Sequence, residues 1–352
     1  MRITPVTPPV NLKSRRPSLN SGLLEQLADR VIGQPQALES IVPYVQMHQA
    51  RLAPEGRPAG VFLLLGPTGT GKTRTVEVLA EALHGNEKHL LKVDCGEFQM
   101  EHEVAKLIGA PPGYLGHRET PPMFTQQKLA AVTSDTSDLA LILFDEIEKA
   151  APSMTRLLLG VLDKATLRLG DNTTVNFERT LIFLTSNLGA REMQKELLPD
   201  FGFEAVAAGA GMSKSVEAGR RKLTAIASSA VRRRFPPEFV NRIDSVITYL
   251  PLESASLATI VDQQIAALEK HIENRLEDDA FEIEVTAAAR RFLLELGTSQ
   301  EFGARELKRT ILRQLTQPMA AMVANGTIQA GDLIEIDTDP SEGRIVIEVK
   351  KN

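Results

Sequence analysis

Short apolar runs alternate with helix-like amphipathic segments up to about residue 250. The apolar runs cover residues 61–66, 90–96, 139–146, 179–187 and 244–252. Near-continuous apolar strands that alternate with helices are typical of a parallel sheet covered by helices on both faces. The pattern therefore predicts a larger α/β domain over residues 21–250.

The pattern changes after Pro251. Helical periodicity covers residues 254–277, 286–297 and 303–325, and β-like alternation covers residues 281–285, 332–336 and 344–350. This combination predicts a smaller C-terminal α+β domain over residues 251–352. Two segments lack periodicity: residues 1–20, predicted to be a disordered basic arm, and residues 204–222, rich in Ala and Gly and predicted to be a surface loop.

Composition narrows the class of protein. Of the 352 residues, 43% are hydrophobic and 24% charged, which is ordinary for a folded globular chain. The net charge of −5 provides no general attraction to nucleic acid or to an anionic membrane. The apolar runs are too short to span a bilayer. The single cysteine, Cys95, excludes an intramolecular disulfide and favours a reducing, cytoplasmic location.

The octapeptide GPTGTGKT, residues 66–73, follows an apolar run and precedes a helical pattern. It fits the motif G-x-x-x-x-G-K-[ST], in which successive backbone N–H groups surround phosphate oxygens. Lys72 is expected to reach the β- and γ-phosphates, and Thr73 to coordinate Mg²⁺. We therefore predict a site for ATP and Mg²⁺ that is formed by Gly66, Pro67, Thr68, Gly69, Thr70, Gly71, Lys72 and Thr73.

Two adjacent acids end the apolar run LILFDE. Asp145 and Glu146 would lie at the carboxyl edge of the parallel sheet, where ligands bind in such folds. Asp145 is the natural partner of Mg²⁺, and Glu146 is the candidate base that polarises water for attack on the γ-phosphate. The two acids could instead cap the next helix. Because they follow the phosphate-binding loop at residues 66–73 (the P-loop), we interpret them as catalytic. The acidic pair favours hydrolysis of ATP over transfer of its phosphate to a bound acceptor.

Two further positions stay open on the residues alone. Asn187 ends the next apolar run and could orient the attacking water or simply form a turn. Tyr114 lies in GAPPGYLGHRETPP, where glycines and prolines exclude a regular helix or central strand. A large ring on such a turn is poorly placed to fill a core and well placed to touch a transient ligand.

The order of these motifs resembles that of the AAA+ ATPases, and specifically the second ATPase ring of the Clp unfoldases ClpB, ClpC and ClpA. The motifs are VIGQ, GPTGTGKT, GAPPGYLG, DEIEKA, TSNLG, PPEFVNRID and GARELKR, from about residue 30 to the C-terminus. The resemblance implies a P-loop domain with a parallel sheet flanked by helices, followed by a smaller α+β lid domain.

The resemblance also assigns nucleotide contacts. Val31 and Ile32 would line the adenine pocket, and Ile260 and Gln263 would close it from the lid. Arg305 would be the arginine through which the lid senses the phosphates.

Arg242 would be the arginine finger that reaches the γ-phosphate in a neighbouring subunit, where such an arginine accelerates hydrolysis by about 10³–10⁵. An active site that needs two subunits implies a ring, expected to be a homo-hexamer. Tyr114 and Leu115 would form a pore loop that grips unfolded or tagged polypeptides in the central channel.

Some features depart from the family. The chain contains one P-loop, and Pro236 stands where these proteins usually have Arg; Arg232, Arg233 and Arg234 just upstream could substitute. The tripeptide FGF, residues 201–203, is a degenerate form of a peptidase-docking loop or an apolar anchor. The predicted function is ATP-dependent protein unfolding. The alternatives are the regulatory subunit of a Clp-type protease, with a peptidase ring or adaptor as partner, a nucleic-acid motor, and a nucleotide-gated binding module.

Overall fold

A parallel five-stranded sheet organises the larger part of the chain. The computed structural model describes residues 19–109, 121–197, 212–298, 303–339 and 343–350. The strand order is β2-β3-β6-β1-β7, and all neighbours pair in parallel. The strands are β1 (Gly60–Leu65), β2 (Leu91–Asp94), β3 (Ala140–Asp145), β6 (Thr180–Ser186) and β7 (Ser245–Thr248). Each lies within one of the five predicted runs, give or take one residue, and the predicted fold class is confirmed.

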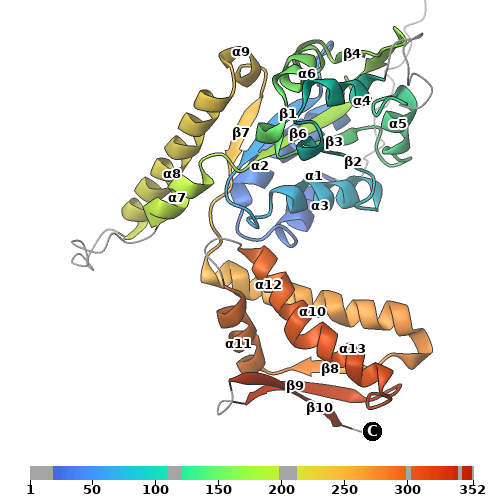
Figure 1. Ribbon diagram of the computed structural model, residues 1–352, viewed down its shortest axis with the longest axis vertical. Helices are drawn as coiled ribbons and strands as arrows, with labels where there is room; N and C mark the ends of the chain where they lie inside the picture. The colour runs from blue at the N-terminus through green and yellow to red at the C-terminus, as the bar shows by residue number, and fades with distance from the viewer. Residues whose placement is uncertain (1–18, 110–120, 198–211, 299–302, 340–342, 351–352) are drawn as a thin grey trace, which may run out of the picture.

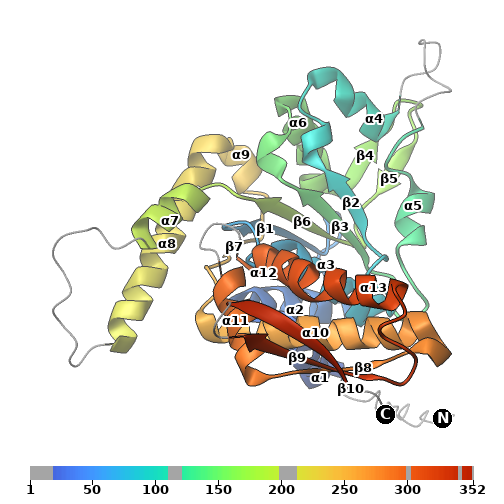
Figure 2. The same cartoon turned by 60° about the horizontal axis from the view of Figure 1, so that its bottom comes forward.

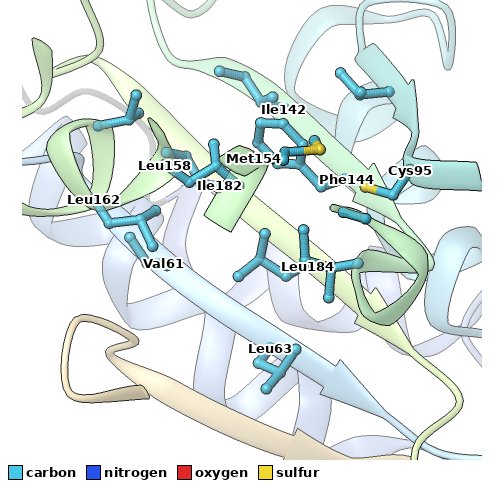
Figure 3. Close-up of a cluster of buried hydrophobic side chains, with 14 of the residues drawn as sticks. Val61, Leu63, Cys95, Ile142, Phe144, Met154, Leu158, Leu162, Ile182 and Leu184 are labelled. Atoms are coloured by element: carbon cyan, nitrogen blue, oxygen red, sulfur yellow. The ribbon is translucent and has the colours of Figure 1, made fainter. Parts of the chain in front are cut away.

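The three central strands of the sheet, β1, β3 and β6, are buried on both faces, which explains why they are almost entirely apolar. Phe62 and Leu64 point into a core shared with helices α1 (Leu19–Ala28), α2 (Pro35–Gln49) and α3 (Lys72–His84). Val61 and Leu63 point to the opposite face, where α6 (Pro152–Lys164) and α8 (Met212–Arg234) pack. Figure 3 shows residues of this second core, including Leu158 of α6 and Ile182 of β6.

Smaller elements connect these layers. The first group is η1 (Cys95–Glu97), η2 (Glu101–Val104), α4 (Ala105–Ile108), α5 (Gln126–Ala131) and η3 (Ile147–Lys149). The second group is the two-stranded sheet of β4 (Thr166–Arg168) and β5 (Thr174–Asn176), with helices α7 (Ala190–Leu197) and α9 (Pro237–Val240). Helices α7 and α8 lie side by side and project from the body (Figures 1 and 2).

A second, three-stranded sheet organises the C-terminal part, which lies below the larger part in Figure 1. β9 (Leu333–Asp339) pairs in parallel with β8 (Glu282–Val285) and antiparallel with β10 (Arg344–Lys350). Its helices are α10 (Ser254–Leu276), η4 (Glu277–Asp279), α11 (Ala287–Gly297), α12 (Ala304–Ile311), η5 (Leu312–Thr316) and α13 (Gln317–Ala324). A separate core that includes Ile265, Leu293 and Ile334 joins them. The predicted domain boundary at residues 250/251 falls in the segment between β7 and α10 and stays a prediction.

The helix predicted over residues 303–325 is interrupted. The π-helical turn η5 separates α12 from α13, and Pro318 occupies the first turn of α13. Proline has no N–H and its ring clashes with the carbonyl one turn earlier, so the regular hydrogen-bond ladder cannot pass through it. A locally wider turn is a common answer to such a break.

The loop predicted over residues 204–222 is partly wrong, because α8 begins at Met212. Lys, Glu, Arg and Ala between residues 214 and 222 have good helix propensity, and the C-terminal half of α8 supplies the buried contacts. The segment predicted as an arm also overlaps α1, which begins at Leu19. Residues 1–18, the pore-loop residues Tyr114 and Leu115, and the tripeptide at 201–203 lie outside the described residues, so those predictions stay predictions. No helix in the described part of the chain is long and apolar enough to cross a membrane.

We expect the thiol of Cys95 to be protected in the folded protein. Its side chain is 0% exposed, and burial raises its pKa, which suppresses the reactive thiolate. Alkylation by iodoacetamide, followed by mass spectrometry, should be on the order of 100-fold slower in buffer than in denaturant. Leu52→Cys, at a position that is 75% exposed, is the control and should gain one rapidly labelled site. Equal native rates at the two positions would contradict this prediction.

Candidate nucleotide site

The loop between β1 and α3 has the backbone of a phosphate cradle. Gly66, Gly69 and Gly71 have φ values of 145°, 78° and 101°, which side chains rarely allow. A Cβ at Gly66 would also lie 2.3 Å from the carbonyl oxygen of Tyr249. Helix α3 begins directly after Gly71, so its positive end faces the loop.

The ammonium of Lys72 is enclosed by oxygen atoms. Its Nζ donates to the carbonyls of Gly66 at 2.7 Å and Pro67 at 2.8 Å, and to Oδ1 of Asn187 at 2.9 Å. Burial lowers the pKa of Lys72 to about 8, and the carboxylates of Glu148 and Asp145 oppose that shift. The fold therefore holds a partly desolvated cation where the motif requires a phosphate ligand.

The two predicted acids lie at the carboxyl end of β3, as expected for a parallel sheet. Asp145 accepts a hydrogen bond from the hydroxyl of Thr185, and its Oδ2 lies 3.0 Å from Nζ of Lys92. Glu146 has the left-handed values φ 56° and ψ 50°, which are strained for a residue with a side chain. Its N–H donates to Oγ1 of Thr185 at 3.0 Å, and its carboxylate pairs with Lys149.

Asn187 connects the acid side of the site to the P-loop. Its Oδ1 accepts from Lys72, and its Nδ2 donates to Oε1 of Glu146 at 3.1 Å. Its backbone N–H donates to Oε1 of Glu148 at 3.0 Å. The amide is thus held in one orientation by a cation on one side and a carboxylate on the other, beyond what a simple turn residue requires.

A cavity of about 550 Å³ brings most of the predicted residues together. It lies between the P-loop, the carboxyl edge of the sheet, and helices α10 and α12. The predicted residues that line it are Val31, Ile32, Thr68, Gly69, Thr70, Gly71, Lys72, Thr73, Asp145, Glu146, Asn187, Ile260, Gln263 and Arg305. Gly66 and Pro67 contribute through the carbonyls that hold Lys72.

Several lining residues escaped the sequence prediction, among them Arg30, Lys92, Thr185, Leu252 and Lys308. Thr185 could have been predicted from the sequence, because it lies with Ser186 and Asn187 at the carboxyl end of a predicted strand, where ligands bind in such folds. Lys92 also lay in a predicted strand, but its pairing with Asp145 depends on the order β2-β3, which a single sequence does not reveal.

The C-terminal part contacts the P-loop through backbone atoms. The N–H of Ala304 donates to the carbonyl of Gly69 at 3.2 Å. Gly303, with φ +49°, lies so close that a Cβ there would be 3.1 Å from the same oxygen. Gln263 of α10 donates to the carbonyl of Asp29 at 2.6 Å. These contacts place Arg305 at the cavity wall.

Gln34 forms a second connection that the sequence did not predict. Its side chain is 5% exposed, and Nε2 donates to the carbonyl of Thr70 at 3.2 Å and to that of Leu250 at 2.8 Å. Leu250 lies in the segment that leads from β7 to α10. One buried amide therefore ties the P-loop to the chain that carries the second sheet.

Arg242 does not line this cavity. It follows α9, where one guanidinium nitrogen donates to the carbonyl of Glu238 at 2.6 Å and Nε lies 3.6 Å from Oδ1 of Asp163. Its side chain is 28% exposed. The structure therefore does not place Arg242 beside the other predicted site residues of its own chain.

The oxygen ligands present fit Mg²⁺ bound together with phosphate. Mg²⁺ is usually held by one or two protein oxygens while phosphates and waters complete an octahedron. Thr73 and Asp145 are the hydroxyl and carboxylate that line the cavity beside the P-loop. In that place Mg²⁺ would neutralise charge on the phosphates.

Nucleotide affinity should fall as the pH rises above about 8, because protonated Lys72 attracts phosphate and the neutral amine does not. The contribution is present below that pKa and declines by up to about tenfold per pH unit above it. Titrations with a fluorescent ADP between pH 7 and pH 9.5 would measure this. Lys72→Met should bind more weakly and show no such slope. The same decline in that variant would assign the effect to another group.

Two family models match adjacent parts of the chain. The one described as "AAA domain (Cdc48 subfamily)" matches residues 57–246. The one described as "C-terminal, D2-small domain, of ClpB protein" matches residues 252–336. The cavity described above is lined by residues of both matched regions and by Arg30, Val31 and Ile32, which precede them.

Relatives and solved structures agree with these matches. The chain is 38% identical over 318 residues to the chaperone protein ClpB of Rhodopseudomonas palustris, covering 90% of the chain and 32% of that protein. It is 37% identical over 329 residues to the probable chaperone protein ClpB 1 of Chlorobaculum tepidum, covering 92% and 69%. The chain thus spans about a third of the first relative and about two thirds of the second.

A closed-state reconstruction of Hsp104 with ATPγS and FITC-casein superposes with a TM-score of 0.78 at 26% identity, covering 96% of this chain and 53% of that one. The Saccharomyces cerevisiae Hsp104–casein complex in its extended conformation gives 0.79, also at 26% identity.

Proposed function

Because this chain belongs to the Clp branch of the AAA+ ATPase family, we propose that it hydrolyses ATP and uses the energy to unfold polypeptides. The observation that carries the proposal is the hydrogen-bonded series from Lys72 through Asn187 to Glu146 at a P-loop. That series links a phosphate-binding cation to a candidate base within one cavity. A module that only bound nucleotide would need the cation but not the oriented acid.

Within one chain, the residues have distinct tasks in this proposal. The N–H groups of the P-loop and the ammonium of Lys72 bind the phosphates of ATP. Thr73 and Asp145 hold Mg²⁺. Glu146 accepts a proton from the attacking water, and Asn187 orients that water and keeps the carboxylate in place. Val31, Ile32, Ile260 and Gln263 enclose the base.

A second copy of the chain completes the site in this proposal. Arg242 lies away from its own cavity, which supports a contact with the γ-phosphate held by a neighbour. An arginine delivered in this way stabilises charge that develops on the transferring phosphoryl group. Six copies in a ring, the arrangement implied by the resemblance, would give every cavity such a partner.

The C-terminal part would convert hydrolysis into movement. Ala304 and Arg305 contact the P-loop side of the cavity, so a change in bound phosphate would alter the angle between the two parts. Tyr114 and Leu115 would move with the larger part and pull polypeptide along the channel.

The substrate class rests on similarity. The Hsp104 structures that resemble this chain contain casein, and ClpB relatives are named chaperones. By analogy we propose unfolded polypeptide as the substrate. The candidate peptidase-docking tripeptide at residues 201–203 lies outside the described residues, so the protease-coupled alternative rests on sequence alone.

Glu146→Gln should bind nucleotide but lose turnover. The amide keeps the size of the side chain and cannot accept the proton, so we expect phosphate release to fall by about 10²–10⁴-fold with ADP affinity unchanged. Glu97→Gln, an exposed acid outside the cavity, is the matched control and should hydrolyse ATP at the normal rate. Normal turnover in Glu146→Gln would refute the assignment of the base.

Tyr114→Ala should uncouple hydrolysis from unfolding. We expect basal ATP hydrolysis within about twofold of the unsubstituted protein and loss of its stimulation by unfolded casein. Tyr114→Phe, which keeps the ring, should retain stimulation. The assay compares casein with single-stranded DNA in all three proteins. Stimulation by DNA alone would favour the nucleic-acid motor, and casein stimulation of Tyr114→Ala would remove the pore-loop assignment.

A further inference from the structure

The last residue of α8, Arg234, is bonded to the loop that carries Glu146. Its Nε and one terminal nitrogen donate to the carbonyl oxygen of Glu148 at 3.1 and 2.7 Å, and that same nitrogen lies 3.3 Å from the carbonyl oxygen of Ala150. The two segments are 86 positions apart in the sequence. A guanidinium fork is well suited to hold two carbonyls at a fixed separation.

Glu148 continues this connection toward the cavity. Its Oε1 accepts the backbone N–H of Asn187, whereas its Oε2 is buried and has no hydrogen-bond partner among the described residues. A buried carboxylate oxygen without a donor is costly, and the bond that Glu148 accepts from Asn187 depends on where the backbone of Glu148 lies. Arg234 fixes that backbone, because both of its bonds to Glu148 are made to the carbonyl oxygen.

The residues held in this way are those assigned to hydrolysis. Asn187 contacts both Lys72 and Glu146. Glu146 has a strained left-handed backbone, a conformation that persists only where surrounding contacts enforce it. Thr185 of β6 accepts the N–H of Glu146, and Arg234 of α8 holds the turn that follows Glu146.

Arg234 also begins the segment that ends in Arg242. Phe235 stacks on Phe239 with ring centroids 5.2 Å apart, and Arg242 bonds back to the carbonyl of Glu238. The segment from α8 through α9 to Arg242 is therefore one packed piece. A displacement of Arg242 by a neighbouring copy would move Arg234 with it.

We propose that Arg234 and Glu148 are positioning residues that tie the Arg242-bearing segment to Asn187 and Glu146 in the same chain. The proposal rests on the hydrolytic function proposed above. It assigns Arg234 a role within its own subunit. Arg234 then does not substitute for the arginine that related proteins usually have at the position of Pro236. The guanidinium fork of Arg234 is already engaged, whereas Arg233 lies 3.8 Å from Glu192 and contacts neither carbonyl.

The kinetic test uses Arg234→Gln and Arg234→Lys, with Arg233→Gln as the adjacent control. We expect Arg234→Gln to lower kcat by about five- to tenfold while KM, ADP affinity and Tm stay unchanged. Arg234→Lys, which keeps the charge and loses the fork, should lie between it and the unsubstituted protein. Combining Arg234→Gln with Glu148→Gln should lower kcat no further than Glu148→Gln alone, since both act through the same loop.

A second measurement does not depend on hydrolysis. Hydrogen exchange of peptides that contain residues 146–150 and 187 should accelerate by about tenfold in Arg234→Gln and stay unchanged in Arg233→Gln. Unchanged exchange and kcat, or a parallel loss of ADP affinity and Tm, would overturn the positioning role. An unsubstituted protein that binds ADP without hydrolysing ATP would overturn the proposed function, while the exchange result would still decide whether Arg234 holds the loop.

Discussion

The nucleotide site depends on how the carbonyl groups of the P-loop are bonded. Lys72 donates hydrogen bonds to the carbonyls of Gly66 and Pro67. The N–H of Ala304 donates to the carbonyl of Gly69, and the side chain of Gln34 donates to that of Thr70. The described residues contain no cis peptide bonds. In a trans peptide unit the N–H points away from the C=O, so a contact that holds a carbonyl also fixes the direction of the N–H group that follows it. The orientation of the P-loop N–H groups therefore depends on these contacts to its carbonyls.

It follows that the two parts of the molecule share one set of hydrogen bonds. Ala304 begins α12 of the C-terminal part, and Gln34 also holds Leu250, at the start of the connection to that part. A rotation of α12 must lengthen the bond to Gly69 or carry the loop along with it. A phosphate that fixes the loop must in turn favour one orientation of α12. Any coupling between the cavity and the C-terminal part would be reciprocal for this reason.

The features that the sequence predicted well are those determined locally. The three central strands, β1, β3 and β6, could be recognised because they are buried on both faces and are almost entirely apolar. The P-loop could be recognised because its eight residues are contiguous. Gln34 and Arg234 could not, since their partners lie 216 and 86 positions away and no periodicity marks a polar residue with a distant partner. The start of α8 was missed because Ala and Gly obscured its helical pattern, and the π-helical turn arises from a single residue, Pro318.

The backbone of Glu146 shows what these distant contacts hold in place. A glycine would adopt its φ of 56° without strain but would offer no carboxylate, so the side chain that Asn187 contacts is carried by an unfavourable backbone conformation. The strain has to be offset by neighbours that hold the residue from several directions. Thr185 does so from β6 and Asn187 from the position after that strand, while Arg234 of α8 holds the carbonyl of Glu148, two positions further along the chain. Because α8 continues into the segment that bears Arg242, the backbone that follows Glu146 is connected through Arg234 to the surface around Arg242.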